Sequence, residues 1–466
     1  MEHLNLSIQV GAKVSIRHYL PFAQTTYSPV FTRGNESWAL PKQLVNISVT
    51  DMTQFKDLSV DLIYVIFSHL QSDKAQLRSL ALSSRLFRDI AQKFIVRNAS
   101  ISHSINGSRT NLFLRTLRER PDLVAHVHRL ELDLLREDIH WPEEQQNIHQ
   151  ITRLLTNLRE LCYLSRDYKV WHYSVPQPLK WGREGIHDQV RKIAWHHNMA
   201  PWELRQCMEL PRIECIYVKE LADSNGRSNP FKVPERKYKT SSLADLRLGS
   251  PYGITYEALL QLLQLPRSLK RITFDSHMRH SSIMAPADLV SLLKHVKDTL
   301  EELVIDVRNA ALELPIQTAD FSGFGSLKKL TVPFRYLFDM PKDEPYHSEP
   351  NLPPSLSELE MVFTLITPPS TNFSTEKLSA NMKNLLALLD WLQAVGGHLE
   401  PPLQTPKLQR ISLHQCDKLS VIPDLRAVDA RDLEHNLRSR IVGQPHKRRL
   451  ELKYYQCTIG EHRQES

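Results

Sequence analysis

A unit of three apolar positions, spaced apolar-x-x-apolar-x-apolar, recurs along the chain after residue 120. The nine examples are Val127, Leu130, Leu132; Leu158, Leu161, Tyr163; Ile213, Ile216, Val218; Leu243, Leu246, Leu248; Leu269, Ile272, Phe274; Leu300, Leu303, Ile305; Leu327, Leu330, Val332; Leu356, Leu359, Met361; and Leu408, Ile411, Leu413. The middle positions are separated by 31, 55, 30, 26, 31, 27, 29 and 52 residues. Most gaps lie near 29, and self-similarity at such a period is typical of a solenoid.

The last two apolar positions of each unit alternate with other residues, which predicts a short strand with one buried face. Helical spacing lies between these strands, at 255–263, 286–296 and, longest of all, 376–394. Pro286 is well placed to open the second of these helices. The sequence therefore predicts an α/β fold of strand–helix units. An ordinary α/β domain with coincidental repeats is the alternative.

The N-terminal part of the chain has a different pattern, most clearly in the predicted helix 62–70. Leu62, Val65, Ile66 and Leu70 supply an apolar stripe at the spacing of a surface helix, and a second apolar surface adds Ile63, Tyr64 and Phe67. A segment of about fifty residues makes only a small core. The surplus apolar face therefore predicts a partner protein, unless the rest of the chain covers it.

The order of residues from 58 to 88 also follows a family pattern. Its opening, middle and close are matched by Leu58, Asp61 and Leu62; by Ile66, Phe67 and Leu70; and by Leu77, Leu80, Ser84, Arg85, Phe87 and Arg88. This segment resembles the F-box, a three-helix module that docks substrate receptors on cullin-based ubiquitin ligases. Ser59 stands where the family usually has proline. Serine can cap a helix as proline can open one, so we expect the helices to form.

The resemblance implies that a Skp-family adaptor binds the module and bridges it to a cullin–RING catalytic core. The adaptor-binding side chains would be Leu58, Ser59, Leu62, Ile66, Phe67, Leu70, Leu80 and Phe87. Full burial of a Leu or Ile is worth about 1.5–3 kcal/mol. Leu62, Ile66 and Leu70 should therefore dominate the contact, offset by the entropy lost on association.

The strand–helix unit resembles an irregular leucine-rich repeat. The ninth unit is the nearest match, because Cys416 and Leu419 follow its three apolar positions as in the cysteine-containing form found in F-box receptors. The other eight units lack the Asn or Cys that normally satisfies the turn backbone. The combination is similar to F-box proteins of filamentous fungi.

In a solenoid of this kind, alternate strand residues face outward on a concave surface. The resemblance implies that this surface binds a protein substrate. The predicted contact residues are Arg129, Glu131, Tyr217, Lys219, Arg247, Arg271, Asp275, Lys329, Arg410 and His414. Their mixed charge favours a protein over nucleic acid, and Tyr217 suits an interface anchor. A solvated face without a ligand is the alternative for each residue.

The pattern predicts four regions: a poorly ordered leader at 1–52, the F-box-like module at 53–101, the repeats at 102–420, and a cap with a basic tail at 421–466. In the last region we expect a helix at 425–441, and a last strand or a cap near 450–454. The formal net charge of +7 is mild for 466 residues. No apolar run is long enough to span a membrane, and no signal-peptide pattern opens the chain. The five cysteines are scattered, as is typical of reduced thiols. We therefore expect a cytoplasmic or nuclear protein.

The sequence lacks the common catalytic and phosphate-binding motifs. His196 and His197 are adjacent and diverge on any regular element, and Cys207 and Cys215 have no His at zinc-ligand spacing. We therefore expect no metal, no cofactor and no enzymatic activity. The sequence favours a substrate-recognition subunit of a Skp–cullin–F-box ubiquitin ligase. The alternative is a non-ligase repeat scaffold, whose F-box-like helices cap the repeats or bind another partner.

Overall fold

The computed structural model describes residues 58–102, 109–133, 141–164, 188–221, 232–249, 254–275, 286–306, 318–338, 350–364, 410–416 and 449–455. The chain divides into two compact units, residues 1–62 and 63–466, and the division falls within the first helix. Predicted features at 1–52, 376–394 and 425–441 lie outside the described residues.

Three helices open the described chain: α1 (Val60–His69), α2 (Lys74–Ser83) and α3 (Arg85–Arg97). The Leu62 N–H donates to Ser59 Oγ at 3.3 Å, so the predicted capping by this serine is confirmed. Asp73 caps α2 by accepting from the backbone N–H groups of Ala75 and Gln76. Ser84 then separates α2 from α3 and caps α3 through the N–H of Phe87. Each cap satisfies a donor that a helix start leaves open.

A parallel sheet follows the helices, and the described strands are hydrogen-bonded in chain order from β1 to β12. The strands are β1 (Asn98–Ser102), β2 (Arg129–Asp133), β3 (Glu160–Leu164), β4 (Lys192–Met199), β5 (Cys215–Leu221), β6 (Asp245–Leu248), β7 (Arg271–Asp275), β8 (Glu302–Asp306), β9 (Lys329–Pro333), β10 (Glu358–Thr364), β11 (Arg410–Cys416) and β12 (Arg449–Tyr455). All nine predicted units form strands, and the predicted α/β class is confirmed. Strands β1 and β4 are additional, and the segment near residue 450 is a strand.

The middle apolar positions of the units form one row across the sheet. Their register runs Ala99, Leu130, Leu161, Ile193, Ile216, Leu246, Ile272, Leu303, Leu330, Leu359, Ile411 and Leu450. The ten from Ala99 to Leu359 are buried. The long gap between units two and three contains β4, because Val190, Ile193 and Trp195 supply the missing apolar positions. The constant register explains why the sequence period is visible at all.

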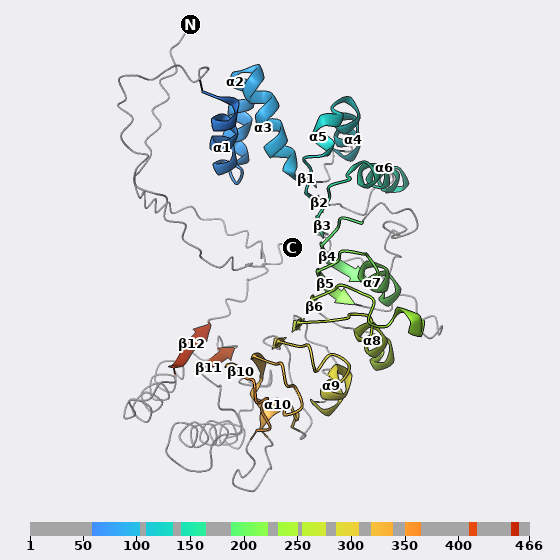
Figure 1. Ribbon diagram of the computed structural model, residues 1–466, viewed down its shortest axis with the longest axis vertical. Coiled ribbons are helices and arrows are strands. Elements are labelled where there is room, and N and C mark those ends of the chain that lie inside the picture. Colours follow the sequence, from blue (N-terminus) through green and yellow to red (C-terminus); the bar gives the residue numbers. More distant parts are fainter. Residues whose placement is uncertain are drawn as a thin grey trace, which may run out of the picture. The chain divides into compact units, whose positions relative to one another are not determined.

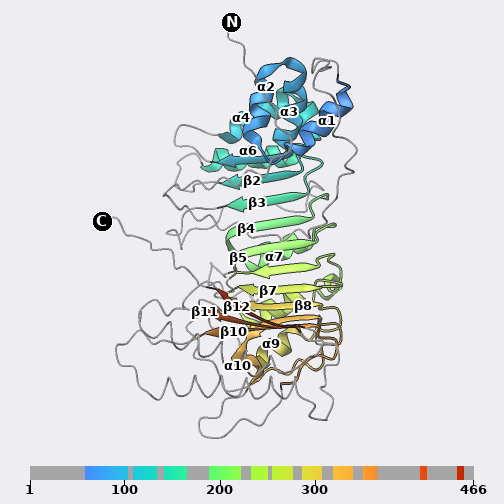
Figure 2. The same ribbon diagram turned by 90° about the vertical axis from the view of Figure 1, so that its left-hand side faces the viewer.

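Helices connect many of the strands: α4 (Arg109–Glu119), α5 (Pro121–Val124), α6 (Trp141–Leu154), α7 (Pro201–Met208), α8 (Tyr256–Leu263), α9 (Pro286–Leu293) and α10 (Phe334–Leu337). Helices α4, α6, α7, α8 and α9 lie on one side of the sheet (Figure 1), and the strands lie in front of them in the turned view (Figure 2). The predicted helix at 255–263 is confirmed as α8, capped by Thr255. Pro286 begins α9 as predicted.

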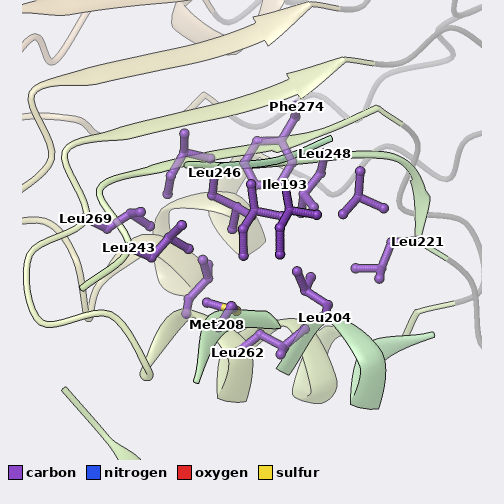
Figure 3. Packing of buried hydrophobic residues seen from close by; sticks show 14 of the residues in the cluster. Ile193, Leu204, Met208, Leu221, Leu243, Leu246, Leu248, Leu262, Leu269 and Phe274 are labelled. Atoms are coloured by element: carbon purple, nitrogen blue, oxygen red, sulfur yellow. The ribbon is translucent and has the colours of Figure 1, made fainter. Parts of the chain in front are cut away.

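The core lies between the sheet and this helix layer. In Figure 3 the strand residues Ile193, Leu246 and Phe274 and the helix residues Leu204 and Leu262 fill the space between the two layers. All five are buried, with exposed fractions of 7% or less. The opposite face of the sheet carries the alternate, mostly polar residues, and we call it the open face. No described helix combines the length and hydropathy that crossing a bilayer requires.

Hydroxyl side chains link successive units at the turns before β6, β8 and β10. Thr299 Oγ1 donates to the carbonyl of Leu269 at 2.9 Å. Ser355 Oγ likewise donates to Leu327 at 2.8 Å, and Ser242 Oγ to Ile213 at 2.7 Å. Each donor precedes the first apolar residue of its unit, and each acceptor is the first apolar residue of the unit before. These bonds satisfy carbonyls of the turns that precede the strands.

Candidate functional site

Helix α1 presents an exposed apolar stripe formed by Leu62, Val65 and Ile66, which we call the α1 stripe. Their exposed fractions are 53%, 53% and 37%. The side of α1 that packs inward is formed by Ile63 and Phe67, both fully buried. The expectation from the apolar pattern alone had the two sides exchanged, because the stripe of Leu62, Val65 and Ile66 is exposed and Ile63 and Phe67 of the supposed surplus surface are the core. Leu62 and Ile66, which the family resemblance assigned to the adaptor contact, are exposed.

The inward side of α1 is aromatic, which explains this arrangement. The Phe67 ring lies 5.7 Å from the Phe87 ring, edge to face, and 6.3 Å from the ring of Phe94. The Lys93 ammonium donates to the Tyr64 hydroxyl at 2.8 Å. An aromatic cluster buries more apolar area than an aliphatic stripe of the same length. The smaller Leu62, Val65 and Ile66 are therefore left on the surface.

The structure distributes the predicted adaptor-binding residues unevenly. Ser59, Leu62 and Ile66 are exposed, and Leu58, Leu70, Leu80 and Phe87 are partly buried. Phe67 is fully buried, so its assignment to a contact surface is wrong, because packing on Phe87 and Phe94 leaves it no surface to offer. Val65 was not predicted as a contact residue. The signal for it was present in the i, i+3, i+4 spacing with Leu62.

Three further apolar side chains are exposed in the three-helix module, and one of them, Val60, is 49% exposed at the start of α1. Leu82 near the end of α2 is 82% exposed, and Leu86 in the first turn of α3 is 43% exposed. Single exposed leucines are ordinary. A stripe of three on one helix, with two more at the next helix–helix turn, is typical of a surface that binds another protein.

The open face of the sheet carries a row of residues at the first position of the strands, all of them charged except Cys215. Their register runs Arg129, Glu160, Lys192, Cys215, Asp245, Arg271, Glu302, Lys329 and Glu358. Neighbours in the row form ion pairs: Lys192 with Glu160 at 3.1 Å, Arg271 with Asp245 at 3.0 Å and with Glu302 at 2.6 Å, and Lys329 with Glu358 at 3.0 Å. Opposite charges at neighbouring positions stabilise the pairing of the strands.

These pairs change the reading of the predicted substrate residues. Arg271 and Lys329 are held by carboxylates of adjacent strands. Arg129 lies 3.1 Å from Glu131, and Arg247 lies 3.0 Å from Asp245. Arg129 and Lys329 are exposed, whereas Glu131, Tyr217, Lys219, Arg247, Arg271 and Asp275 are half-buried. Arg410 and His414 lie on β11, and their side chains are outside the described set. The charges of this face thus largely neutralise each other.

An aromatic pair lies on the same sheet. The His196 ring on β4 is 4.9 Å from the Tyr217 ring on β5. Burial lowers the pKa of His196, as do the charges of Lys219 and Arg129, while Glu131 acts in the opposite direction. The imidazole is therefore neutral at pH 7. Tyr217 was predicted as a contact residue and His196 was not, because nothing in the spacing of the two residues indicates that β4 and β5 are adjacent.

The described cysteines are not activated for chemistry. Cys162, Cys207 and Cys215 are free and buried, as predicted for structural thiols. Burial raises the pKa of Cys162 to about 11 and that of Cys215 to about 12, with Glu131 and Asp245 acting in the same direction. Such thiols stay protonated at neutral pH. Among the described residues, no three or more His, Cys, Asp or Glu side chains are grouped to hold a metal ion.

Comparison with known protein families and with curated proteins finds no match for this chain.

Proposed function

We propose that the chain is the substrate-recognition subunit of a Skp–cullin–F-box ubiquitin ligase. The α1 stripe would dock a Skp-family adaptor, and the sheet would hold a protein substrate on its open face in the manner of an irregular leucine-rich repeat solenoid. The observation that carries the proposal is the α1 stripe, because Leu62, Val65 and Ile66 remain exposed although the opposite side of the same helix is fully buried.

The energetics support a protein partner at this helix. Full burial of one Leu or Ile is worth about 1.5–3 kcal/mol, so the three side chains of the stripe can contribute several kcal/mol to docking. Leu62 and Ile66 also occupy positions of the F-box pattern, on the family's first helix. The inward-facing Ile63 and Phe67 hold α1 in its module without them. Docking can therefore proceed without any unfolding of the module.

The test is co-purification of the full chain with a recombinant Skp-family adaptor. Leu62→Lys and Ile66→Lys should each weaken binding at least tenfold, because each buries a charge where the wild type buries a hydrocarbon. Leu112→Lys is the matched control, since Leu112 on α4 is 57% exposed, close to the 53% of Leu62, and lies outside the module. Circular dichroism should show the same helix and strand content in all four proteins.

Wild-type binding that is lost in both stripe variants and kept in the control supports the receptor function. A folded wild-type chain that fails to bind the adaptor contradicts it.

A second candidate is a repeat scaffold whose helices cap the sheet. The observation in its favour is the junction between α3 and β1, which has no intervening loop. The Arg120 guanidinium also donates to Gln92 of α3 at 2.9 Å and lies 3.5 Å from Asp89 of the same helix. These contacts connect α3 to β1 and to the α4–α5 turn whether or not the helices bind an adaptor. The adaptor experiment separates the two functions. If the helices only cap the sheet, the wild-type chain forms no adaptor complex, and the stripe variants have no binding to weaken.

A further inference from the structure

The residue just before each strand has an equivalent place in successive units. The backbone hydrogen bonds begin there: the N–H of His128 donates to Arg97 at 3.0 Å, that of Arg159 to His128 at 2.8 Å, and that of Arg191 to Arg159 at 2.8 Å. Arg97, His128, Arg159 and Arg191 are thus neighbours along the edge where β1 to β4 begin. We call these four residues the basic ridge.

The same position is charge-balanced in the later units. Glu301 lies 2.7 Å from Lys328 and 3.4 Å from Lys270, so each of these cations has an acidic neighbour. At the end of the ridge, Arg191 lies 3.1 Å from Glu214, the next residue in the row. The upstream ridge has no such alternation. Arg97 and Arg159 are exposed, and neither side chain forms a hydrogen bond or ion pair with any residue that the structure describes.

His128 lies between Arg97 and Arg159 in this row, and its pKa is sensitive to the charges around it. Burial lowers the pKa of His128, and the charges that act on it, those of Arg97, Arg159 and His126, lower it further. No carboxylate opposes them. Burial also lowers the pKa of His126, the charges of Lys93 and Arg97 lower it further, and only that of Asp122 acts in the opposite direction. Like charges at neighbouring strand positions destabilise a sheet. The ridge is therefore a local excess of positive charge that the fold does not neutralise.

We propose that the basic ridge binds a short anionic peptide segment of a partner protein, through carboxylate or phosphate groups that accept hydrogen bonds from Arg97, Arg159 and Arg191. Guanidinium groups suit both kinds of anion, because their paired N–H donors match two oxygens at once. Taken with the proposed function, the segment belongs to the substrate. The proposal adds the chemical class that the substrate must carry.

The length of the ridge favours a peptide over a nucleic acid. Neighbouring strands are about 4.8 Å apart, so four positions span about 14 Å. That length matches about four residues of an extended peptide at about 3.3 Å each. A nucleic-acid binding surface that contacts about 6–10 phosphates needs a longer basic track than this. The acidic Glu214 ends the ridge well before such a length is reached.

The experiment uses fluorescein-labelled peptides and the full chain, with binding followed by fluorescence anisotropy. The probes are a serine–glycine peptide, the same peptide with alternate residues replaced by glutamate, and the same peptide with phosphoserine at those positions. We expect the uncharged peptide not to bind, and the two anionic peptides to bind more weakly as salt is raised. The better of the two anionic probes identifies the anion.

Variants locate the contact. Arg97→Gln and Arg159→Gln should each weaken binding of the better peptide about tenfold. Lys328→Gln is the matched control, since it removes a charge at the same position of a later unit, where Glu301 already lies 2.7 Å away, and it should leave binding unchanged. Glu214→Gln should strengthen binding, because it releases Arg191 from its ion pair.

Two results would contradict the proposal that the basic ridge binds an anionic peptide. One is equal peptide binding by the wild type and both arginine variants. The other is a single-stranded oligonucleotide that binds more tightly than either peptide and is lost in the same variants. Adaptor binding is measured on the same proteins and should be unaffected by the ridge variants. A wild-type chain that binds the anionic peptide but not the adaptor would contradict the ligase function and would still support peptide binding by the basic ridge.

Discussion

Lys74 Nζ on α2 donates a hydrogen bond to the backbone carbonyl of Asn98, the first residue of β1, at 2.8 Å. β1 lies at the edge of the sheet, with β2 as its partner strand. A lysine over an edge strand satisfies a carbonyl and discourages pairing with another chain. The bond also connects the three-helix module to the sheet by a route other than the backbone.

Replacing Lys74 by methionine tests this connection. The variant keeps the aliphatic stem and removes the donor, so we expect a loss of about 0.5–1.5 kcal/mol in the free energy of unfolding. Amide hydrogen exchange in β1 should become faster. Arg115→Met serves as the control, because the Arg115–Glu119 pair is 68% and 64% exposed and contributes little. An unchanged exchange rate in β1 would show that the bond does not hold the edge.

Alanine should destabilise the protein far more on the buried side of α1 than on the exposed side. Phe67→Ala removes a fully buried ring and should lower the free energy of unfolding by about 3–5 kcal/mol. Leu62→Ala removes a side chain that is 53% exposed and should change stability by about 0.5 kcal/mol or less. Urea titrations followed by circular dichroism measure both values. Comparable losses in the two variants would contradict the assignment of the two sides.

Gly249, just after β6, has a role that alanine cannot fill. A Cβ at this position would lie 2.2 Å from the carbonyl oxygen of Lys219 on β5, and backbone atoms in a sheet cannot move aside. The Gly249 N–H donates to Val218 at 2.7 Å, which fixes the close approach. We expect Gly249→Ala to cost at least about 1–3 kcal/mol. Gly323→Ala is the control, with nothing within 4 Å of its Cβ, and its thermal midpoint should match that of the wild type or exceed it.

Glu203 gives the protein a specific pH dependence. Burial raises its pKa to about 7, although its carboxylate accepts a hydrogen bond from the Ala200 N–H at 2.8 Å. The folded state then binds a proton more tightly than the unfolded state. This contribution to stability is present below about pH 4.5 and is lost as the pH rises through about 7.

The isosteric variant Glu203→Gln keeps an acceptor for Ala200 and removes the titration. Relative to this variant, the wild type should gain on the order of 1–3 kcal/mol in unfolding free energy between pH 8 and pH 5. Chemical unfolding of both proteins at the two pH values measures the difference. If the unfolding free energies of the two proteins change with pH in the same way, the pKa of Glu203 is not raised.

Strand positions were predictable because burial imposes a fixed spacing. Two strands escaped the pattern for different reasons. In β1 the middle apolar position is the small Ala99, which follows α3 directly and carries a weak hydrophobic signal. In β4 the third position is Trp195, whose indole N–H donates to the Asn198 carbonyl at 3.2 Å beside an irregularity in the strand register.

The links between units could be recognised only after folding. A hydroxyl before an apolar residue is common in any sequence, so Thr299 and Ser355 carry no signal until the turn that accepts their bonds is known. The basic ridge was hidden in the same way. Arg97 and Arg159 are 62 residues apart in sequence, and parallel pairing in constant register brings them to the same edge. The exposed side of α1 was misassigned because helical spacing cannot tell which of two apolar sides faces inward.

The order of the strands has a consequence for how the protein loses its structure. Each described strand is bonded to the strands that come before and after it in the chain, and β1 and β12 are the ends of the series. Disruption in the middle removes the support of two neighbours, whereas disruption at an end removes the support of one. Melting should therefore advance inward from a terminus, one unit at a time, and the central units should be the last to exchange their amide protons. An insertion between two units should likewise destabilise the units on either side of it and leave distant units intact.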